Sequence, residues 1–260
     1  MTRGFLVILR TELFGLFISP ATYVSTFYFL ALLGVGFRFF IESFQGTNWI
    51  LPPLSSLALG LLFGSPALIP FLTMKAIAEE RRLGTLETLM SAPVNSSSII
   101  LGKWSASYIF FLIICSGAYA FPFILLTLFP EQAISLGFNR SEHWIGGFVF
   151  LMTFGASFSA IGIFASSITK NQMVAGMLSF SLITLYLSVM AFSYGEPSRI
   201  NEFDSLSEII GMIGGSLNRG LDKINYFAVG IIHIPTILHQ IIVVFFFLSL
   251  ATLQIEKIRH

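Results

Sequence analysis

Residues 74–103 read MKAIAEERRLGTLETLMSAPVNSSSIILGK and hold the densest charge cluster of a very apolar chain. Long apolar runs flank this stretch on both sides. A charged segment held between two membrane spans must lie at a water face, because hydrocarbon does not solvate charges. The stretch therefore marks a point where the chain leaves the membrane and returns to it.

The composition is typical of a polytopic membrane protein. The chain has 260 residues, of which 55% are hydrophobic and only 10% charged, and its mean hydropathy is +0.85. Soluble domains carry about 25% charged residues. The apolar runs are spread evenly, which predicts a single membrane domain over residues 1–260. The net charge of +1 indicates no nucleic acid partner, and the single Cys115 excludes a disulfide framework.

The hydropathy pattern predicts an all-α fold with six spans and an N-terminal interfacial helix. Residues 4–18 place their apolar side chains near one helical stripe, and Ser19-Pro20 ends the helix. A span needs about 20 residues to cross about 30 Å of hydrocarbon. Between the last two spans, residues 194–235 predict one or two short amphipathic or re-entrant helices. The predicted spans are 21–41, 52–74, 103–129, 145–168, 173–193 and 236–255.

The distribution of Lys and Arg predicts the orientation. With six spans, both termini share one side of the membrane, and cationic residues concentrate on the cytoplasmic side. We therefore expect a multi-pass protein of the plasma (inner) membrane, with both termini and residues 74–103 in the cytoplasm. Nine of the 14 Lys and Arg residues fall on that side: Arg3, Arg10, Lys75, Arg81, Arg82, Lys103, Lys170, Lys257 and Arg259.

The spans offer no catalytic or metal-binding set. No Asp, Glu or Lys lies in them away from their ends, which argues against an ion-coupled carrier. His239 is the single histidine in a span, too little for a metalloprotease or for a serine intramembrane protease. The one Gly-Lys pair, Gly102-Lys103, lacks the upstream glycine of a phosphate-binding loop. Energy for any uphill transport must come from another protein.

Residues 75–93 have the pattern of two short helices at a water face. Lys75 to Arg82 can continue the second span as a charged rod with pairing between residues three and four apart. Gly84 permits a bend, Thr85 is a good N-cap, and Pro93 limits the following helix. These residues alone are equally compatible with a force-transmitting transverse helix and with an ordinary charged loop.

The same segment carries a family resemblance. EERRLGTLETL at 79–89, IILGK at 99–103 and FASSITKNQ at 164–172 resemble the permease subunits of ABC-2 type exporters. The similarity is greatest to the gliding-motility-type and copper-processing-type permeases. It covers nearly the whole chain and implies the transmembrane domain of an ABC-2 (type V) exporter with an N-terminal elbow helix.

The resemblance implies a coupling helix at about 85–93 that sits in a cleft of a separate ATP-binding subunit. ATP and Mg²⁺ would bind to that subunit, and this chain would be neither an enzyme nor a cofactor carrier. A second permease subunit, identical or different, would complete the pathway with spans 1, 2 and 5, among membrane lipids. The substrate stays open, and so does a non-transport role as scaffold or assembly factor of a gliding-type envelope machine. The residues implied to contact the ATP-binding subunit are Glu79, Glu80, Arg81, Arg82, Gly84, Thr85, Glu87 and Thr88.

Overall fold

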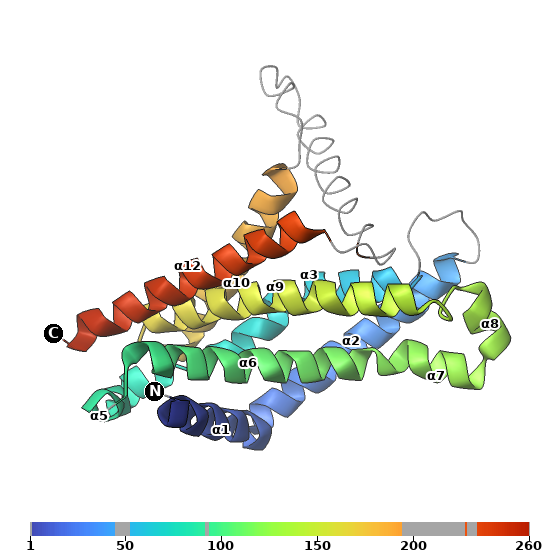
Figure 1. Ribbon diagram of the computed structural model, residues 1–260. Helices are drawn as coiled ribbons and strands as arrows, with labels where there is room; N and C mark the ends of the chain where they lie inside the picture. The colour runs from blue at the N-terminus through green and yellow to red at the C-terminus, as the bar shows by residue number, and fades with distance from the viewer. Residues whose placement is uncertain (1, 45–52, 92–93, 194–226, 228–232, 260) are drawn as a thin grey trace, which may run out of the picture.

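Long helices account for most of the chain in the computed structural model, which describes residues 2–44, 53–91, 94–193, 227 and 233–259 (Figure 1). The predicted re-entrant helices of 194–235 lie almost wholly outside the described residues. The helices are α1 (Thr2–Ile18), α2 (Pro20–Phe44), α3 (Pro53–Thr73), α4 (Ala78–Leu83), α5 (Thr85–Ser91), α6 (Ser96–Ala118), α7 (Ala120–Leu128), α8 (Pro130–Ser135), α9 (Ser141–Ile168), α10 (Gln172–Ser193) and α12 (Ile234–Arg259).

Six stretches of the described chain are long and apolar enough to cross a membrane. Since the described elements are helices without strands, the predicted all-α fold with six spans is confirmed. The third span consists of two helices in succession, α6 and α7. The six stretches are Pro20–Phe39, Leu57–Leu83, Ser96–Leu128, Ser141–Ile168, Gln172–Met190 and Ile234–Lys257.

Helix α9 is the central element, because α3, α6, α10 and α12 all pack against it. Its small residues allow this close approach. A Cβ built on Gly155 would lie 2.2 Å from Cε1 of Phe111 on α6, and one built on Gly162 would lie 2.4 Å from the hydroxyl of Thr73 on α3. Gly155 and Gly162 therefore lie on a close-packing face of α9.

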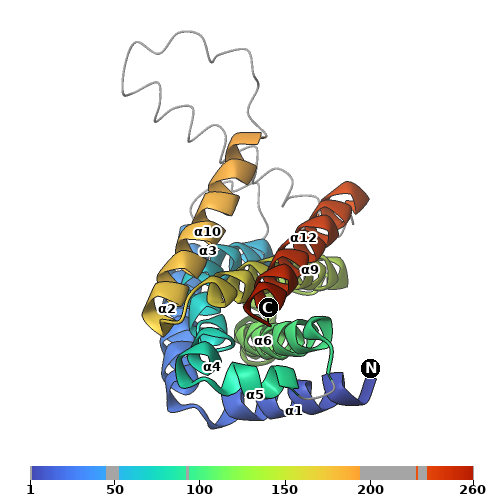
Figure 2. The same ribbon diagram turned by 90° about the vertical axis from the view of Figure 1, so that its left-hand side faces the viewer.

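Helix α1 lies across one end of the bundle (Figure 2). The apolar stripe predicted at 5–17 mostly faces α6, where Ile8 is buried and the Phe17 ring contacts Phe110 with centroids 5.1 Å apart. A second stripe is 57–65% exposed and consists of Leu6, Val7, Phe14 and Ile18. The helix therefore has one face against the protein and one exposed apolar face, a pattern typical of interfacial helices.

The charged rod predicted from Lys75 to Arg82 is not continuous. Helix α3 ends at Thr73, a turn follows over residues 74–77, and α4 begins at Ala78. The bend predicted at Gly84 is present, with φ of 72°. Helix α5 begins at Thr85 itself, whose hydroxyl donates to the Glu80 carbonyl at 3.4 Å. Residues 130–144, between the third and fourth predicted spans, contain the short helix α8 and the first turn of α9.

Replacement of Gly155 by alanine should destabilise the bundle. The added methyl group would clash with the Phe111 ring, which is 1% exposed and has little room to move. We expect a loss of about 1–3 kcal/mol, typical of overpacked cores, measured as a lower midpoint of thermal unfolding in detergent. Gly36→Ala on α2 is the control, since nothing lies within 4 Å of its added Cβ. Equal midpoints for the two variants would contradict the packing described here.

Candidate functional site

Helices α4 and α5 form a corner at the end of the bundle where both termini lie (Figure 1). We call residues 78–91 the corner segment. Gly84 joins the two helices in the left-handed conformation, with φ of 72° and ψ of 3°. A residue with a Cβ is strained there, so the glycine is what allows α5 to turn away from α4. The corner segment packs near α1 at the foot of the bundle (Figure 2).

Helix α5 is amphipathic. Leu86 and Met90, four residues apart, are 2% and 6% exposed, whereas Glu87 on the opposite face is exposed. The two buried side chains belong to an apolar cluster at this end of the bundle. That cluster unites α5 with four longer helices and the 74–77 turn, so α5 is fastened to the bundle along one face. Its other members are Ile8, Ala76, Ile77, Ile99, Ile100, Ala160, Ile163, Leu248, Ala251 and Ile255.

Ser166 of α9 holds the break between α3 and α4. Its hydroxyl oxygen accepts hydrogen bonds from the backbone N–H groups of Ile77 and Ala78, both at 3.1 Å, and it donates to the Met74 carbonyl at 3.2 Å. The first N–H groups of a helix have no acceptor within the helix. Ser166, fully buried, supplies that acceptor from a neighbouring element. The serine therefore acts as a tertiary N-cap for α4.

Arg81 makes the complementary contact, from α4 to the end of α9. Its guanidinium donates to the Ser167 carbonyl at 2.5 Å, close to the C-terminus of α9. Carbonyl groups in the last turn of a helix lack intrahelical donors and favour a cation. Helices α4 and α9 therefore cap one another, and we call the two contacts, through Ser166 and Arg81, the joint. The joint also brings together the two segments, 79–103 and 164–172, that carry the family resemblance.

A second contact fastens α4 to α1 through a buried lysine. The Lys103 side chain on α6 is 1% exposed, and its ammonium group binds Glu80 of α4 at 2.8 Å and Glu12 of α1. The carboxylates are 26% and 27% exposed, so water solvates them in part. Burial of an ammonium group is costly unless it is paired and hydrogen-bonded, and two carboxylates meet that need here. We call these three residues the ion cluster.

The eight residues implied to contact an ATP-binding subunit do not share one environment. Glu80 and Arg81 point inward, to Lys103 and to Ser167. Glu79 is 34% exposed and lies 3.8 Å from Arg82, in the pairing predicted for residues three apart. The corner segment therefore has an inner set that fixes its position and an outer set that is open to a partner. The exposed residues of the outer set are Arg82, Gly84, Thr85, Glu87 and Thr88.

Sequence reasoning missed Glu12, Lys103 and Ser166. Lys103 was placed at the edge of the third span, but α6 begins at Ser96, so the lysine lies well inside the helix. One signal was available for Glu12, since it lies four residues after Ile8 on the protein-facing stripe of α1. Ser166 is 89 residues from Ile77, and no local pattern points to that contact.

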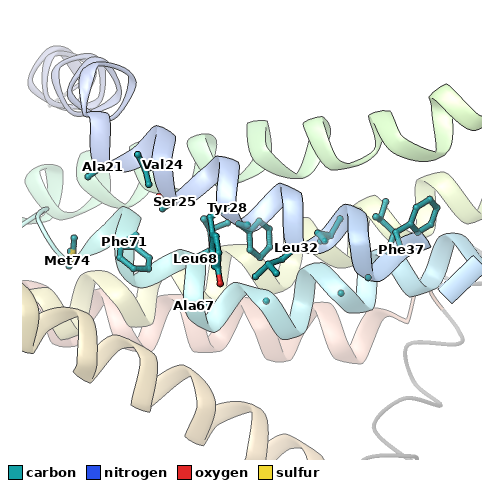
Figure 3. Close-up of a pocket in the computed structure, with 16 residues that line it drawn as sticks. Ala21, Val24, Ser25, Tyr28, Leu32, Phe37, Ala67, Leu68, Phe71 and Met74 are labelled. Atoms are coloured by element: carbon teal, nitrogen blue, oxygen red, sulfur yellow. The ribbon is translucent and has the colours of Figure 1, made fainter. Parts of the chain in front are cut away.

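An apolar groove of about 820 Å³ runs between α2 and α3 on the outside of the bundle (Figure 3). It extends from Met74, beside the corner segment, to Phe37 near the other end of α2. Ser25 and Tyr28 contribute hydroxyl groups to a lining that is otherwise apolar. The groove is suited to apolar molecules or to another apolar helix.

The comparison with known families agrees with this geometry. A model of the ABC-2 family transporter protein matches residues 18–210. That range covers the six helices from α2 to α7, together with α8, α9 and α10, and so includes the corner segment and the joint. No curated protein matches the chain.

Removal of the Ser166 half of the joint should loosen α4 without unfolding the bundle. In Ser166→Ala the N–H groups of Ile77 and Ala78 lose their acceptor, and we expect faster hydrogen exchange in residues 74–83. Ser167→Ala is the matched control, because the Ser167 hydroxyl donates only within α9, to the Phe164 carbonyl. Mass spectrometry of peptic peptides measures the effect. Equal rates of hydrogen exchange in residues 74–83 of the two variants would contradict the capping role of Ser166.

Removal of the lysine alone should destabilise the protein more than removal of all three charges of the ion cluster. Lys103→Met leaves Glu12 and Glu80 facing each other without a cation. We expect a loss of about 2–3 kcal/mol, below the value for fully buried pairs because both carboxylates are partly exposed. The triple variant Glu12→Gln, Glu80→Gln, Lys103→Met should recover much of that stability. A lower midpoint of thermal unfolding for the triple variant than for Lys103→Met would contradict this account of the ion cluster.

Proposed function

The chain belongs to the ABC-2 family of transporter proteins, and on that premise we propose that it is the permease subunit of an exporter driven by a separate ATP-binding subunit. The chain forms part of the membrane pathway, and the partner binds ATP and Mg²⁺ and hydrolyses the nucleotide. We also propose that, within the family, the chain is related to the gliding-motility-type and copper-processing-type permeases.

The corner segment is the observation that supports the proposal most strongly. Its outer set presents charged and polar groups, while Leu86 and Met90 fix α5 to the apolar cluster. A partner that binds Glu87 therefore acts on an element that is attached to α1, α6, α9 and α12. Force applied at the surface can reach the spans through packed side chains and does not depend on a flexible loop.

The proposal places the corner segment in the cytoplasm. The end of the bundle with α5 also carries both chain termini (Figure 1). An excess of Lys and Arg at that end agrees with the distribution that orients membrane proteins. We therefore place the protein in the plasma (inner) membrane with both termini in the cytoplasm, where an ATP-binding subunit is located.

A second permease subunit, identical or different, covers the face formed by α2, α3 and α10. Two features support this part of the proposal. Only 17% of the apolar stretch of α2, and 17% of that of α10, is buried within one chain, compared with 67% for α9; α12, at 22%, is similarly exposed. The groove between α2 and α3 offers a concave apolar surface on the same face. Substrate then passes between the two permease subunits.

Reversal of the charge at Glu87 should weaken binding of the ATP-binding subunit. Glu87 lies on the exposed face of α5, so Glu87→Lys leaves the buried face intact. After co-expression with the proposed ATP-binding subunit, we expect about tenfold less of that subunit to co-purify, the effect of one interface hot spot. Gly84→Ala should act in the same direction, because alanine strains the corner.

The control for this experiment is Glu131→Lys, an exposed glutamate on α8 at the opposite end of the bundle. It should leave co-purification unchanged. Replacement of residues 84–93 by a neutral linker should abolish both co-purification and ATP-dependent flux into vesicles. If the linker variant retains both co-purification and flux, the docking role is refuted. If the unaltered protein binds the ATP-binding subunit but shows no flux, a role as scaffold of an envelope machine is favoured.

A further inference from the structure

The apolar groove between α2 and α3 lies within the hydrocarbon. It is lined by residues from the range 21–37 on α2 and from the range 57–74 on α3 and the turn after it, and both ranges lie in apolar stretches that can cross a membrane. A helix rises about 1.5 Å per residue, so the groove is about 24 Å long, compared with about 30 Å of hydrocarbon. Its volume of about 820 Å³ falls in the range of about 300–1,000 Å³ that is common for ligand sites. The groove is therefore suited to a long, thin ligand.

Apolar side chains that line the groove are exposed. Val24 and Leu32 on α2 are 70% and 55% exposed, and Phe71 on α3 is 51% exposed. Figure 3 shows Leu32 on the α2 side of the groove and Phe71 on the α3 side. Water does not fill an apolar space stably, because it finds too few hydrogen-bond partners there. In a membrane the occupant is therefore hydrocarbon, either a lipid chain or a helix of another subunit.

The glycines of α3 favour the lipid chain over a helix. Small residues spaced four apart form a notch that lets a second helix approach closely. On α3 the helix in that notch is α2 of the same chain. A Cβ built on Gly64 would lie 2.4 Å from Cε2 of Phe29, and the nearest atom to a Cβ built on Gly60 is Cδ1 of Leu33 at 3.8 Å. The notch is therefore not left for a helix of a partner, whereas a flexible chain needs no notch.

Gly36 keeps the groove open on the α2 side. It lines the groove, and nothing lies within 4 Å of a Cβ built on it. A glycine inside a helix is destabilising relative to alanine, and packing within this chain does not require one here. The space beside Gly36 belongs to the groove, and a side chain at this position would stand where a ligand lies.

The groove has a more polar end. Ser25 and Tyr28 of α2 lie in the half of the groove that is nearer to Met74 (Figure 3). Lys75 follows Met74 at the same end. Hydroxyl and ammonium groups can donate to ester and phosphate oxygens. An amphipathic ligand therefore lies with its polar part near Met74 and its apolar chain towards Phe37.

We propose that the groove binds one hydrocarbon chain of a membrane phospholipid, whose headgroup lies at the Met74 end. The chain contacts α2 and α3 together, whereas a chain on an exposed single helix contacts only that helix. Since a lipid chain gains no hydrophobic free energy by moving from the bilayer to the protein, the preference rests on this closer van der Waals packing. The proposed second permease subunit covers the face with the chain beneath it. Binding requires neither ATP nor the ATP-binding subunit, so its failure is distinguishable from a failure of the proposed function.

A phosphatidylcholine with a diazirine in its palmitoyl chain tests the site in membrane vesicles that contain the full chain without ATP. After photolysis, mass spectrometry of peptides locates the label. The internal reference is Ile242 and Phe245 of α12, which are 66% and 74% exposed but do not line the groove. We expect about fivefold more label at Leu32 and Phe71 than at these two residues, because a chain held between two helices stays longer.

Two variants fill the groove from opposite sides. Gly36→Leu places a side chain in it from α2, and Ala67→Leu enlarges an exposed lining residue of α3. Each should lower the label at Phe71 about fivefold, to the level of α12, because the filled space no longer holds the chain. Gly117→Leu on α6 is the matched control, since Gly117 is also exposed, has nothing within 4 Å of an added Cβ and does not line the groove. The midpoint of thermal unfolding shows that each variant is folded.

Equal labelling of the groove and of α12 in the unaltered protein would overturn the proposal. So would labelling at Phe71 that is the same in both filled variants as in Gly117→Leu. If a helix of the second permease subunit fills the groove, the label is absent from Leu32 and Phe71, and that result would overturn the proposal as well.

Discussion

The two hydrogen bonds from Ile77 and Ala78 to Ser166 are the interaction on which the charged end of the bundle depends. A helix that breaks at the membrane boundary exposes N–H groups that must find acceptors. Ser166 provides one acceptor for both groups, and Gly162, one turn earlier, allows α3 to come close enough. Without this cap, the N–H groups of Ile77 and Ala78 would lack an acceptor, and the start of α4 would be held less firmly against α9.

The ion cluster adds a second connection that involves α1. Lys103 joins α4 to the interfacial helix, and Ile8 of α1 packs beside Gly102 on the same helix as the lysine. The joint links α4 to α9, and the apolar cluster links α5 to α12. Together these contacts make the corner segment, α1 and the ends of three spans a single packed unit. Movement at the surface is then shared by elements that are distant in the sequence.

Polar side chains also join helices away from the charged end, where the Ser157 hydroxyl on α9 donates to the Gln240 side-chain oxygen on α12. At the charged end, hydroxyl and charged groups fix helices in relation to one another and are nearly all enclosed. Ser157 and Gln240, both almost fully buried, do the same between α9 and α12. The two regions share α9 and α12, which both also contribute to the apolar cluster that holds α5.

Sequence reasoning predicted the elements that depend on local pattern. The six apolar spans, the interfacial helix and the bend at Gly84 follow from hydropathy and from the backbone freedom of glycine. The outer set of the corner segment was also recognisable, by its charges and by resemblance. The break at 74–77 was not, because Ser166 caps it from 89 residues away. The inward direction of Glu80 depends in the same way on Lys103, and a pattern of charges cannot distinguish a partner in the chain from a partner outside it.

The most direct test is a measurement by pulsed electron paramagnetic resonance on the permease bound to its ATP-binding subunit. Spin labels on Glu87→Cys and Lys170→Cys, both exposed, report the distance between α5 and the turn after α9. If the joint couples the two rigidly, ATP binding changes the distance between the Glu87 positions of the two permease subunits and leaves the Glu87–Lys170 distance within one subunit unchanged. A change within one subunit, with no change between subunits, would contradict the account.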